Sequence, residues 1–215
     1  MNAGLFRLLN VVRGWGTGLF LSVCAVFCCS CAASASEIRA SYASVGGATS
    51  VPYGWLDFCS RHADECNVDA SAARTVELNG GTLARLSAVN ARVNRFIKPV
   101  SNFEHWGTML DHWDYPTDGK GDCKIFALYK RKLLLGMGFP RQALLMTIVR
   151  DLNGEGHTIL TVKTDKGDLI LDNLVGQVRS WDETGYRFVK RQSQENPNVW
   201  LSMGDVVGLR QAASY

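Results

Sequence analysis

The stretch Gly119-Lys120-Gly121-Asp122-Cys123-Lys124 places a cysteine where a glycine-rich loop runs into a helical pattern. Apolar residues recur at helical intervals from Cys123 to Met137, Gly136 and Gly138 end the segment, and Pro140 prevents the helix from resuming. At a helix N-terminus, the helix dipole and the free backbone N–H groups favour the thiolate, which is the nucleophilic form of cysteine. We therefore predict that Cys123 begins a helix and acts as a nucleophile; the alternative is a buried structural cysteine.

After this helix the periodicity changes to that of strands. Runs with strand composition lie at 144–149, 157–163, 168–172, 186–191 and 199–203. The turn signal Thr164-Asp165-Lys166-Gly167 joins the second and third runs into a hairpin. Because helical segments come first and antiparallel strands follow, the fold class is predicted to be α+β.

A helix is also predicted at 82–97, before the cysteine. Apolar residues with helical spacing support it: Leu83, Leu86, Val89, Val93 and Phe96. Thr82 is its predicted N-cap. Residues 98–122 then form a long connection rich in aromatic residues, and a loop of this length in a compact domain is usually functional.

The predicted hairpin brings a histidine and an aspartate together. With residues 165–166 at its tip, Ile159 faces Asp172, and His157 lies on the same face as Ile159 because side chains alternate along a strand. His157 and Asp172 are then diagonal neighbours, about 7–8 Å apart at the backbone. Asp172 can accept the imidazole N–H and orient the ring, and His157 can serve Cys123 as its base.

Other residues compete for these roles. A slip of one residue would put Asn173 in place of Asp172, and Cys-His-Asn arrangements also exist. Asp168 lies on the same face as His157 and is a second competitor. Substrate-wall or structural roles are expected for the remaining histidines, His62, His105 and His112.

The N-terminus has the pattern of a secretory signal peptide. Arg7 and Arg13 precede an almost wholly apolar run at 19–29, and Ala33-Ser34-Ala35 fits a cleavage site. We predict cleavage after Ala35 and a periplasmic or secreted protein; an uncleaved N-terminal anchor is the alternative. The small polar residues of 36–51 are predicted to form a flexible leader, and 52–215 the single domain.

Cleavage would leave three cysteines in the mature chain. In an oxidising compartment, Cys59 and Cys66 are close enough in sequence to form a disulfide. The alternative is that both stay reduced. Cys123 is then the odd thiol, and a redox sensor with Cys59 or Cys66 as the resolving cysteine is a weaker reading.

Charge and metal-ligand spacing exclude several functions. Lys and Arg number 23 against 20 Asp and Glu, and this small excess gives no argument for nucleic acid binding. Cys123 has no Cys-x-x-Cys partner and no His-x-x-x-His pair is present, so the sequence does not suggest a zinc site. Asp111, Asp114 and Asp118 could offer oxygen ligands to calcium, but we expect them to lie in a solvated loop.

No apolar run after the signal is long enough to span a membrane.

Several motifs together resemble a known family. Gly-Lys-Gly-Asp-Cys at 119–123, Gly-His-Thr at 156–158 and Leu-Asp-Asn-Leu at 171–174 occur in the order found in the bacterial transglutaminase-like cysteine peptidases. Further matches lie at 52–55, at Phe58-Cys59, at 93–96 and at 181–186. The similarity covers about residues 52–203. The family includes the LapG-like proteases, which release adhesins.

The resemblance implies a papain-like fold with a nucleophile at the start of a helix packed on an antiparallel sheet. It implies Cys123 as nucleophile, His157 as base and then acid, and Asp172 as orienter. The Cys123 backbone N–H is expected to hold the oxyanion. The expected partner is a protein or peptide substrate, and the adhesin-releasing branch suggests a cell-envelope adhesin by analogy. The acyl group would be transferred to water, or alternatively to an amine.

Calcium is associated with the adhesin-releasing branch, through an aspartate at the position of Asp122 and an acid after the cysteine. Here Lys124 replaces that acid. We therefore expect no required cofactor, with calcium at Asp122 as the alternative, and we expect Lys124 to point to solvent. The altered residues after Cys123 also leave a second function open, a binding protein that keeps the fold without catalysis.

Overall fold

The computed structural model describes residues 40–204. Its main element is a seven-stranded sheet with the order β1-β9-β8-β4-β5-β6-β7, in which every pair of neighbours is antiparallel. The strands are β1 (Ala48–Thr49), β4 (Leu144–Arg150), β5 (Gly156–Thr164), β6 (Gly167–Leu171), β7 (Arg179–Ser180), β8 (Arg187–Gln192) and β9 (Trp200–Ser202). The helices are α1 (Tyr53–Arg61), α2 (Ala63–Cys66), α3 (Gly80–Phe96), α4 (Asn102–Trp106), α5 (Cys123–Gly136) and the short 3-10 turns η1 (Arg141–Ala143) and η2 (Trp181–Glu183).

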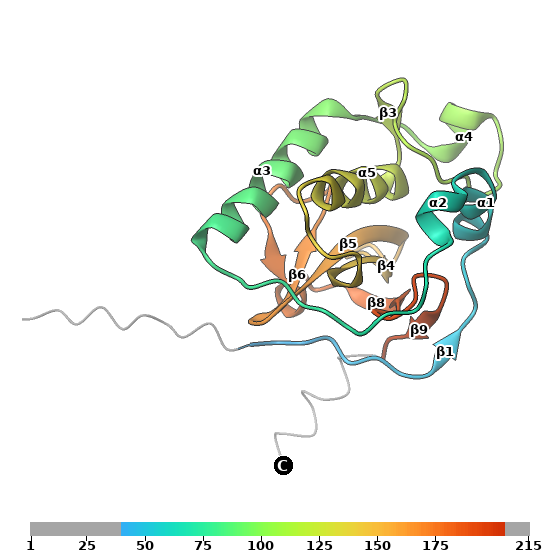
Figure 1. The fold of residues 1–215 in the computed structure, drawn as a ribbon. Coiled ribbons are helices and arrows are strands. Elements are labelled where there is room, and N and C mark those ends of the chain that lie inside the picture. Colours follow the sequence, from blue (N-terminus) through green and yellow to red (C-terminus); the bar gives the residue numbers. More distant parts are fainter. Residues whose placement is uncertain (1–39, 205–215) are drawn as a thin grey trace, which may run out of the picture. The chain divides into compact units, whose positions relative to one another are not determined.

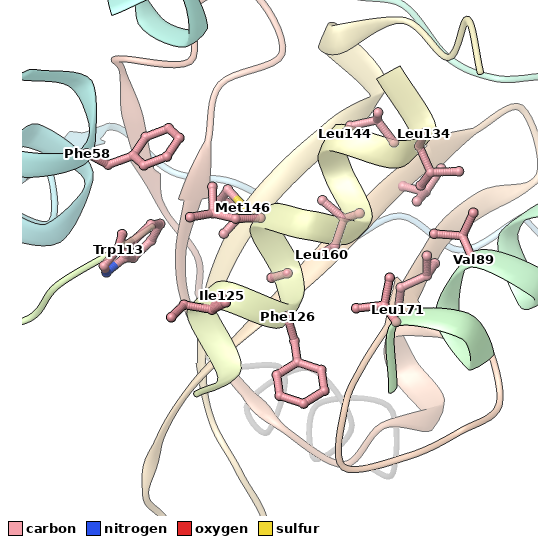
Figure 2. Close-up of a cluster of buried hydrophobic side chains, with 14 of the residues drawn as sticks. Phe58, Val89, Trp113, Ile125, Phe126, Leu134, Leu144, Met146, Leu160 and Leu171 are labelled. Carbon is pink, nitrogen blue, oxygen red and sulfur yellow. The ribbon is translucent and has the colours of Figure 1, made fainter. Parts of the chain in front are cut away.

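This arrangement confirms the predicted α+β class. Helices α3 and α5 lie on one face of the sheet, and α5 packs directly on β5 (Figure 1). The buried residues between them include Ile125, Met146 and Leu160, which Figure 2 shows around α5. Each fully buried aliphatic side chain of this kind contributes about 1.5–3 kcal/mol to folding. The helix that begins at Cys123 is thereby fixed to the strand that carries His157.

The hairpin of β5 and β6 has the predicted register. Thr164 pairs with Gly167, and the ladder continues to Leu160 opposite Leu171. The next position along each strand places Ile159 and Asp172 at the same level. The turn geometry therefore sets the relation between His157 and Asp172, and the slip that would have presented Asn173 does not occur.

Helix α5 begins at Cys123, as predicted, and two glycines explain the loop before it. Gly119 has φ of +74°, a conformation that side chains other than glycine's disfavour. A Cβ on Gly121 would lie 2.6 Å from Cβ of Ile125, so only glycine allows this close approach. The loop is also paired: β3 (Lys120–Gly121) runs parallel to β2 (Lys98–Pro99).

Two predictions about the segments before α5 differ from the structure: the start of α3 and the absence of regular structure in 98–122. Helix α3 starts at Gly80, two residues before the predicted N-cap Thr82, because the side chain of Asn79 accepts a hydrogen bond from the Thr82 backbone N–H at 2.9 Å. The connection 98–122 is also not a continuous loop. It contains α4, whose N-cap Ser101 forms a capping box with Glu104.

The N-terminal part of the described chain is part of the sheet. Within the predicted leader, β1 pairs with β9, Ser41 bridges Gly167, and Ala43 is buried. The leader from residue 40 onward therefore takes part in the fold. The predicted signal peptide, 1–35, lies outside the described residues. None of the helices within residues 40–204 is long and apolar enough to cross a membrane.

A disulfide joins Cys59 at the end of α1 to Cys66 at the end of α2, with their Cα atoms 5.6 Å apart. The predicted pairing is therefore present, and Cys123 is the free cysteine of residues 40–204. The redox-sensor reading has no reduced partner for Cys123 in this part of the chain.

Candidate active site

Cys123 occupies the first position of α5, and its side chain is partly exposed. Asp122 caps the helix, since its Oδ1 accepts the backbone N–H of Lys124 at 3.3 Å. The N–H groups of a first helical turn have no partner within the helix. The thiol and the backbone N–H of Cys123 therefore share the positive end of the α5 dipole.

His157 and Asp172 form a direct pair at the edge of the hairpin. Nε2 of His157 lies 2.8 Å from Oδ1 of Asp172, and both residues are buried. The same Oδ1 accepts the backbone N–H of Leu174 at 3.0 Å. The carboxylate thus fixes the ring of His157 with its Nε2–H turned toward Asp172, which leaves Nδ1 as the ring nitrogen for another partner.

Cys123 and His157 line the same cleft, and the Cys123 thiol interacts electrostatically with the His157 ring. Burial lowers the pKa of His157, but hydrogen bonds with Asp172 and Cys123 and the charges of both groups outweigh burial and raise the pKa to about 9. An imidazole in this state stays protonated at neutral pH when it faces a thiolate. The structure therefore brings together the three residues that the sequence singled out.

Asp172 is held in its charged form. Burial would raise the pKa of Asp172, but hydrogen bonds from His157, Tyr186 and the Leu174 backbone lower it below its usual value. The Asn94 side chain donates to the backbone carbonyl of Asp172 at 2.8 Å and ties this position to α3. Asp172 is therefore a fixed negative charge behind His157.

Tyr186 is a site residue that sequence reasoning missed. Its hydroxyl donates to Oδ2 of Asp172 at 2.6 Å, and its ring meets the His157 ring edge to face with centroids 5.9 Å apart. Tyr186 is the last residue of the 181–186 motif, which the resemblance singled out without a role for it. The signal was present, but the contact depends on how η2 and β8 fold back onto the hairpin.

Replacing Tyr186 by phenylalanine is expected to lower the free energy of unfolding by about 1.5–3 kcal/mol, because a buried carboxylate loses a hydrogen-bond donor. Urea unfolding of Y186F and of the control Y53F measures this difference. Tyr53 is 58% exposed, so its substitution should change little. Equal stabilities of the two variants would contradict the role given to the Tyr186 hydroxyl.

Lys130 is a second residue near the site, which the helical spacing of 123–137 includes but to which the sequence assigns no role in the site. It lies two turns after Cys123 on α5 and is 1% exposed. Burial lowers its pKa to about 7, and the charge of Asp172 opposes that shift only in part. Its ammonium lies 5.9 Å from the centroid of the Phe126 ring. Helical spacing places Lys130 on the same face as the buried residues Phe126, Ala127 and Leu134, but it does not predict the lowered pKa of the amine.

A cleft of about 340 Å³ opens onto Cys123 and His157. Its other lining residues are Pro99, Val100, Ser101, Glu104, Asp122, Phe126, Asp151, Glu155, Gly156, Asn173 and Leu174. They come from the 98–122 connection, from α5, from the β4–β5 loop and from the segment after β6. An extended polypeptide could therefore reach the thiol from solvent.

Asn173 lines the cleft, whereas Asp168 and the other three histidines lie elsewhere. Asp168 is fully buried and pairs with Lys163 and Arg191. The remaining histidines pair with carboxylates away from the cleft: His62 with Asp114, His105 with Asp118, and His112 with Asp57 and Asp114. None of these three histidines lines the cleft of Cys123.

The expectation that Lys124 points to solvent is wrong. Its side chain is 11% exposed, and its ammonium forms ion pairs with Asp122 and, at 2.8 Å, with Asp111. Burial lowers the pKa of Lys124, but the charge of Asp122 and the hydrogen bonds to both carboxylates outweigh burial and raise it. The carboxylates of Asp111 and Asp122 are thus already paired with a cation from the chain.

A thiol at the start of a helix, next to an imidazole and a carboxylate on an antiparallel sheet, is the arrangement of papain-like cysteine hydrolases. Comparison with known proteins makes the class specific. The family model of bacterial transglutaminase-like cysteine proteinases (BTLCP) matches residues 45–207. The chain belongs to this family and is a cysteine peptidase that acts on protein substrates. A search of the curated proteins found no match.

Solved structures of LapG from Legionella pneumophila are similar to this chain. One is 27% identical, covers 61% of this chain and 75% of that chain, and has a TM-score of 0.48. An EGTA-treated structure is 28% identical over 59% and 73% of the two chains, with a TM-score of 0.47. A calcium-bound structure is 24% identical over 64% and 83%, with a TM-score of 0.48.

These structures correct the expectation about cofactors. We expected no required cofactor, whereas the calcium-bound and EGTA-treated LapG structures indicate that calcium is involved in relatives of this chain. Within residues 40–204, no group of three or more His, Cys, Asp or Glu side chains is arranged to hold a metal ion. The Lys124 ammonium pairs with both Asp111 and Asp122, so these two carboxylates do not fit a calcium ion as they are placed.

Proposed function

We propose that this chain hydrolyses a peptide bond of a protein substrate through Cys123, His157 and Asp172, in the periplasm or after secretion. The observation that carries the proposal is the position of His157, which is bonded to the carboxylate of Asp172 and lines the same cleft as the thiol of Cys123. A base held between a nucleophile and an orienting acid is the arrangement that thiol catalysis requires.

The reaction follows from these positions. The thiolate of Cys123 attacks the carbonyl carbon of the scissile bond, and the carbonyl oxygen becomes an oxyanion near the backbone N–H of Cys123. The imidazolium of His157 then gives its proton to the leaving amine, the C–N bond breaks, and an acyl-enzyme remains. Neutral His157 next takes a proton from water as the water oxygen attacks the thioester, and the Cys123 thiolate leaves.

The disulfide supports the proposed location. Cys59 and Cys66 are bonded to each other, and disulfides persist in oxidising compartments such as the periplasm. The proposed cleavage after Ala35 would deliver residues 36–215 there. The domain would then comprise residues 52–215. A leader precedes it, and the leader pairs with the sheet at Ser41 and at 48–49. A cell-envelope adhesin is the substrate class that the sequence resemblance suggests for this location.

Alkylation by iodoacetamide tests the proposal without a known substrate. At pH 6, the wild-type chain should be labelled at Cys123, and H157A should be labelled at least about tenfold more slowly, because the imidazolium that supports the thiolate is gone. H112A is the matched control, since His112 lies outside the cleft. Equal rates for the wild type and H157A would show that Cys123 is only an exposed thiol and would favour a binding protein without catalysis.

A further inference from the structure

A second cavity, of about 170 Å³, shares no lining residue with the cleft of Cys123. Its wall is formed by the C-terminal half of α5, by η1 and β4, and by the segment after β8. Two arginines, Arg131 and Arg141, contribute to this wall. Leu144, Leu145 and Gln192 form buried parts of it, so the cavity has an inner end inside the fold.

The two arginines share one carboxylate. Nη1 of Arg131 donates to Oε2 of Glu65 at 2.9 Å, and Nη1 of Arg141 donates to the same oxygen at 3.2 Å. The other oxygen of Glu65 accepts the Tyr115 hydroxyl at 2.6 Å. Arg131 is 1% exposed, and its Nε and Nη2 are buried without a hydrogen-bond partner among residues 40–204.

Among Arg131, Arg141 and Glu65, one positive charge is in excess. Burial would raise the pKa of Glu65, but the hydrogen bond from Tyr115 and the charge of Arg131 outweigh burial and lower it to about 2, so Glu65 carries a single negative charge. Burial, followed by repulsion from Arg141, lowers the pKa of Arg131. A buried charge that is only partly paired is costly, and an anion in the cavity would reduce that cost.

We infer that this cavity binds a small oxyanion of the carboxylate or phosphate class. Arg141 supplies the hydrogen bonds, since its guanidinium is 28% exposed and only its Nη1 is bonded to Glu65. Arg131 supplies a fixed positive charge behind it. The exposed carboxylates of Asp69 and Glu195 also line the cavity. Their negative charges oppose anion binding, so hydrogen bonds from Arg141, and not the net charge of the lining, must hold the anion.

Melting temperatures test the site with sodium acetate and sodium phosphate as probes, against sodium chloride at matched ionic strength. A saturable rise of about 3–6 °C is expected at ten times the dissociation constant. R141Q should lose this rise, and R92Q, which changes an exposed arginine of α3, should keep it. An equal rise in all three proteins would be a general salt effect and would overturn the inference, as would the absence of a rise in the wild type.

A second measurement on the wild-type chain covers the case in which R141Q does not fold. Side-chain NMR signals of Arg131 and Arg141 should shift in a saturable way as acetate is added, and unchanged signals at saturating acetate would overturn the inference. N-acetylglycine and its amide separate free acids from peptide chain ends. Binding of the acid but not the amide means that a C-terminal carboxylate is accepted. Binding of acetate alone restricts the site to free small anions, which still supports it.

Discussion

The C123A variant is expected to lose at least about 10⁴-fold of the peptide-releasing activity of the wild-type chain. Without the thiol no acyl-enzyme forms, and His157 has only water to activate. No other free cysteine is present in residues 40–204 to replace the lost nucleophile. The measurement is the rate at which purified protein releases peptides from cell-envelope proteins, followed by mass spectrometry, once with calcium and once with a chelator in the buffer.

Two controls make the result specific. The melting temperature of C123A should match that of the wild type, since Cys123 is partly exposed at the end of a helix. The double variant C59S/C66S removes the disulfide but keeps Cys123. Assayed below its own melting temperature, it should retain activity. Peptide release by folded C123A at the wild-type rate would remove Cys123 from the mechanism.

The sequence predicts most of the framework of the site, because the signals involved are local. The change from helical spacing to alternation separates α5 from β4 and β5. The four residues 164–167 set the register of the hairpin, and that register alone places Asp172 beside His157 rather than Asn173. Cys123 is found because loop and helix signals meet at one residue.

The parts that the sequence does not predict depend on contacts between distant segments. Tyr186 reaches Asp172 only after the chain has passed through β7 and η2, and Lys124 meets Asp111 through the folded-back connection before α5. Glu65 and Arg131 are 66 positions apart. No periodicity relates such pairs, because their partners are chosen by packing. The start of α3 is predicted wrongly for a simpler reason. Asn79 and Thr82 can both cap a helix, and the sequence does not show which of them does so.

Asparagine at position 172 is expected to reduce kcat/KM by about 10²- to 10⁴-fold. The carboxylate of Asp172 holds the His157 ring through Nε2 and stabilises its protonated form. A neutral amide of the same shape keeps the volume but loses the charge, and it can present an N–H where the ring needs an acceptor. The ring is then free to take the wrong tautomer or orientation toward Cys123.

The pH dependence separates this effect from simple loss of structure. The pKa of His157 is raised to about 9 in part by Asp172, so kcat/KM of the wild type should fall at alkaline pH with a midpoint near 9. Removing the negative charge makes the imidazolium less favourable, and the midpoint for D172N should move to lower pH. E155Q is the matched control, because exposed Glu155 lines the same cleft without a hydrogen bond to His157. If D172N, E155Q and the wild type share the same alkaline midpoint, Asp172 does not set the protonation of His157. The role proposed for Asp172 in the triad would then be wrong.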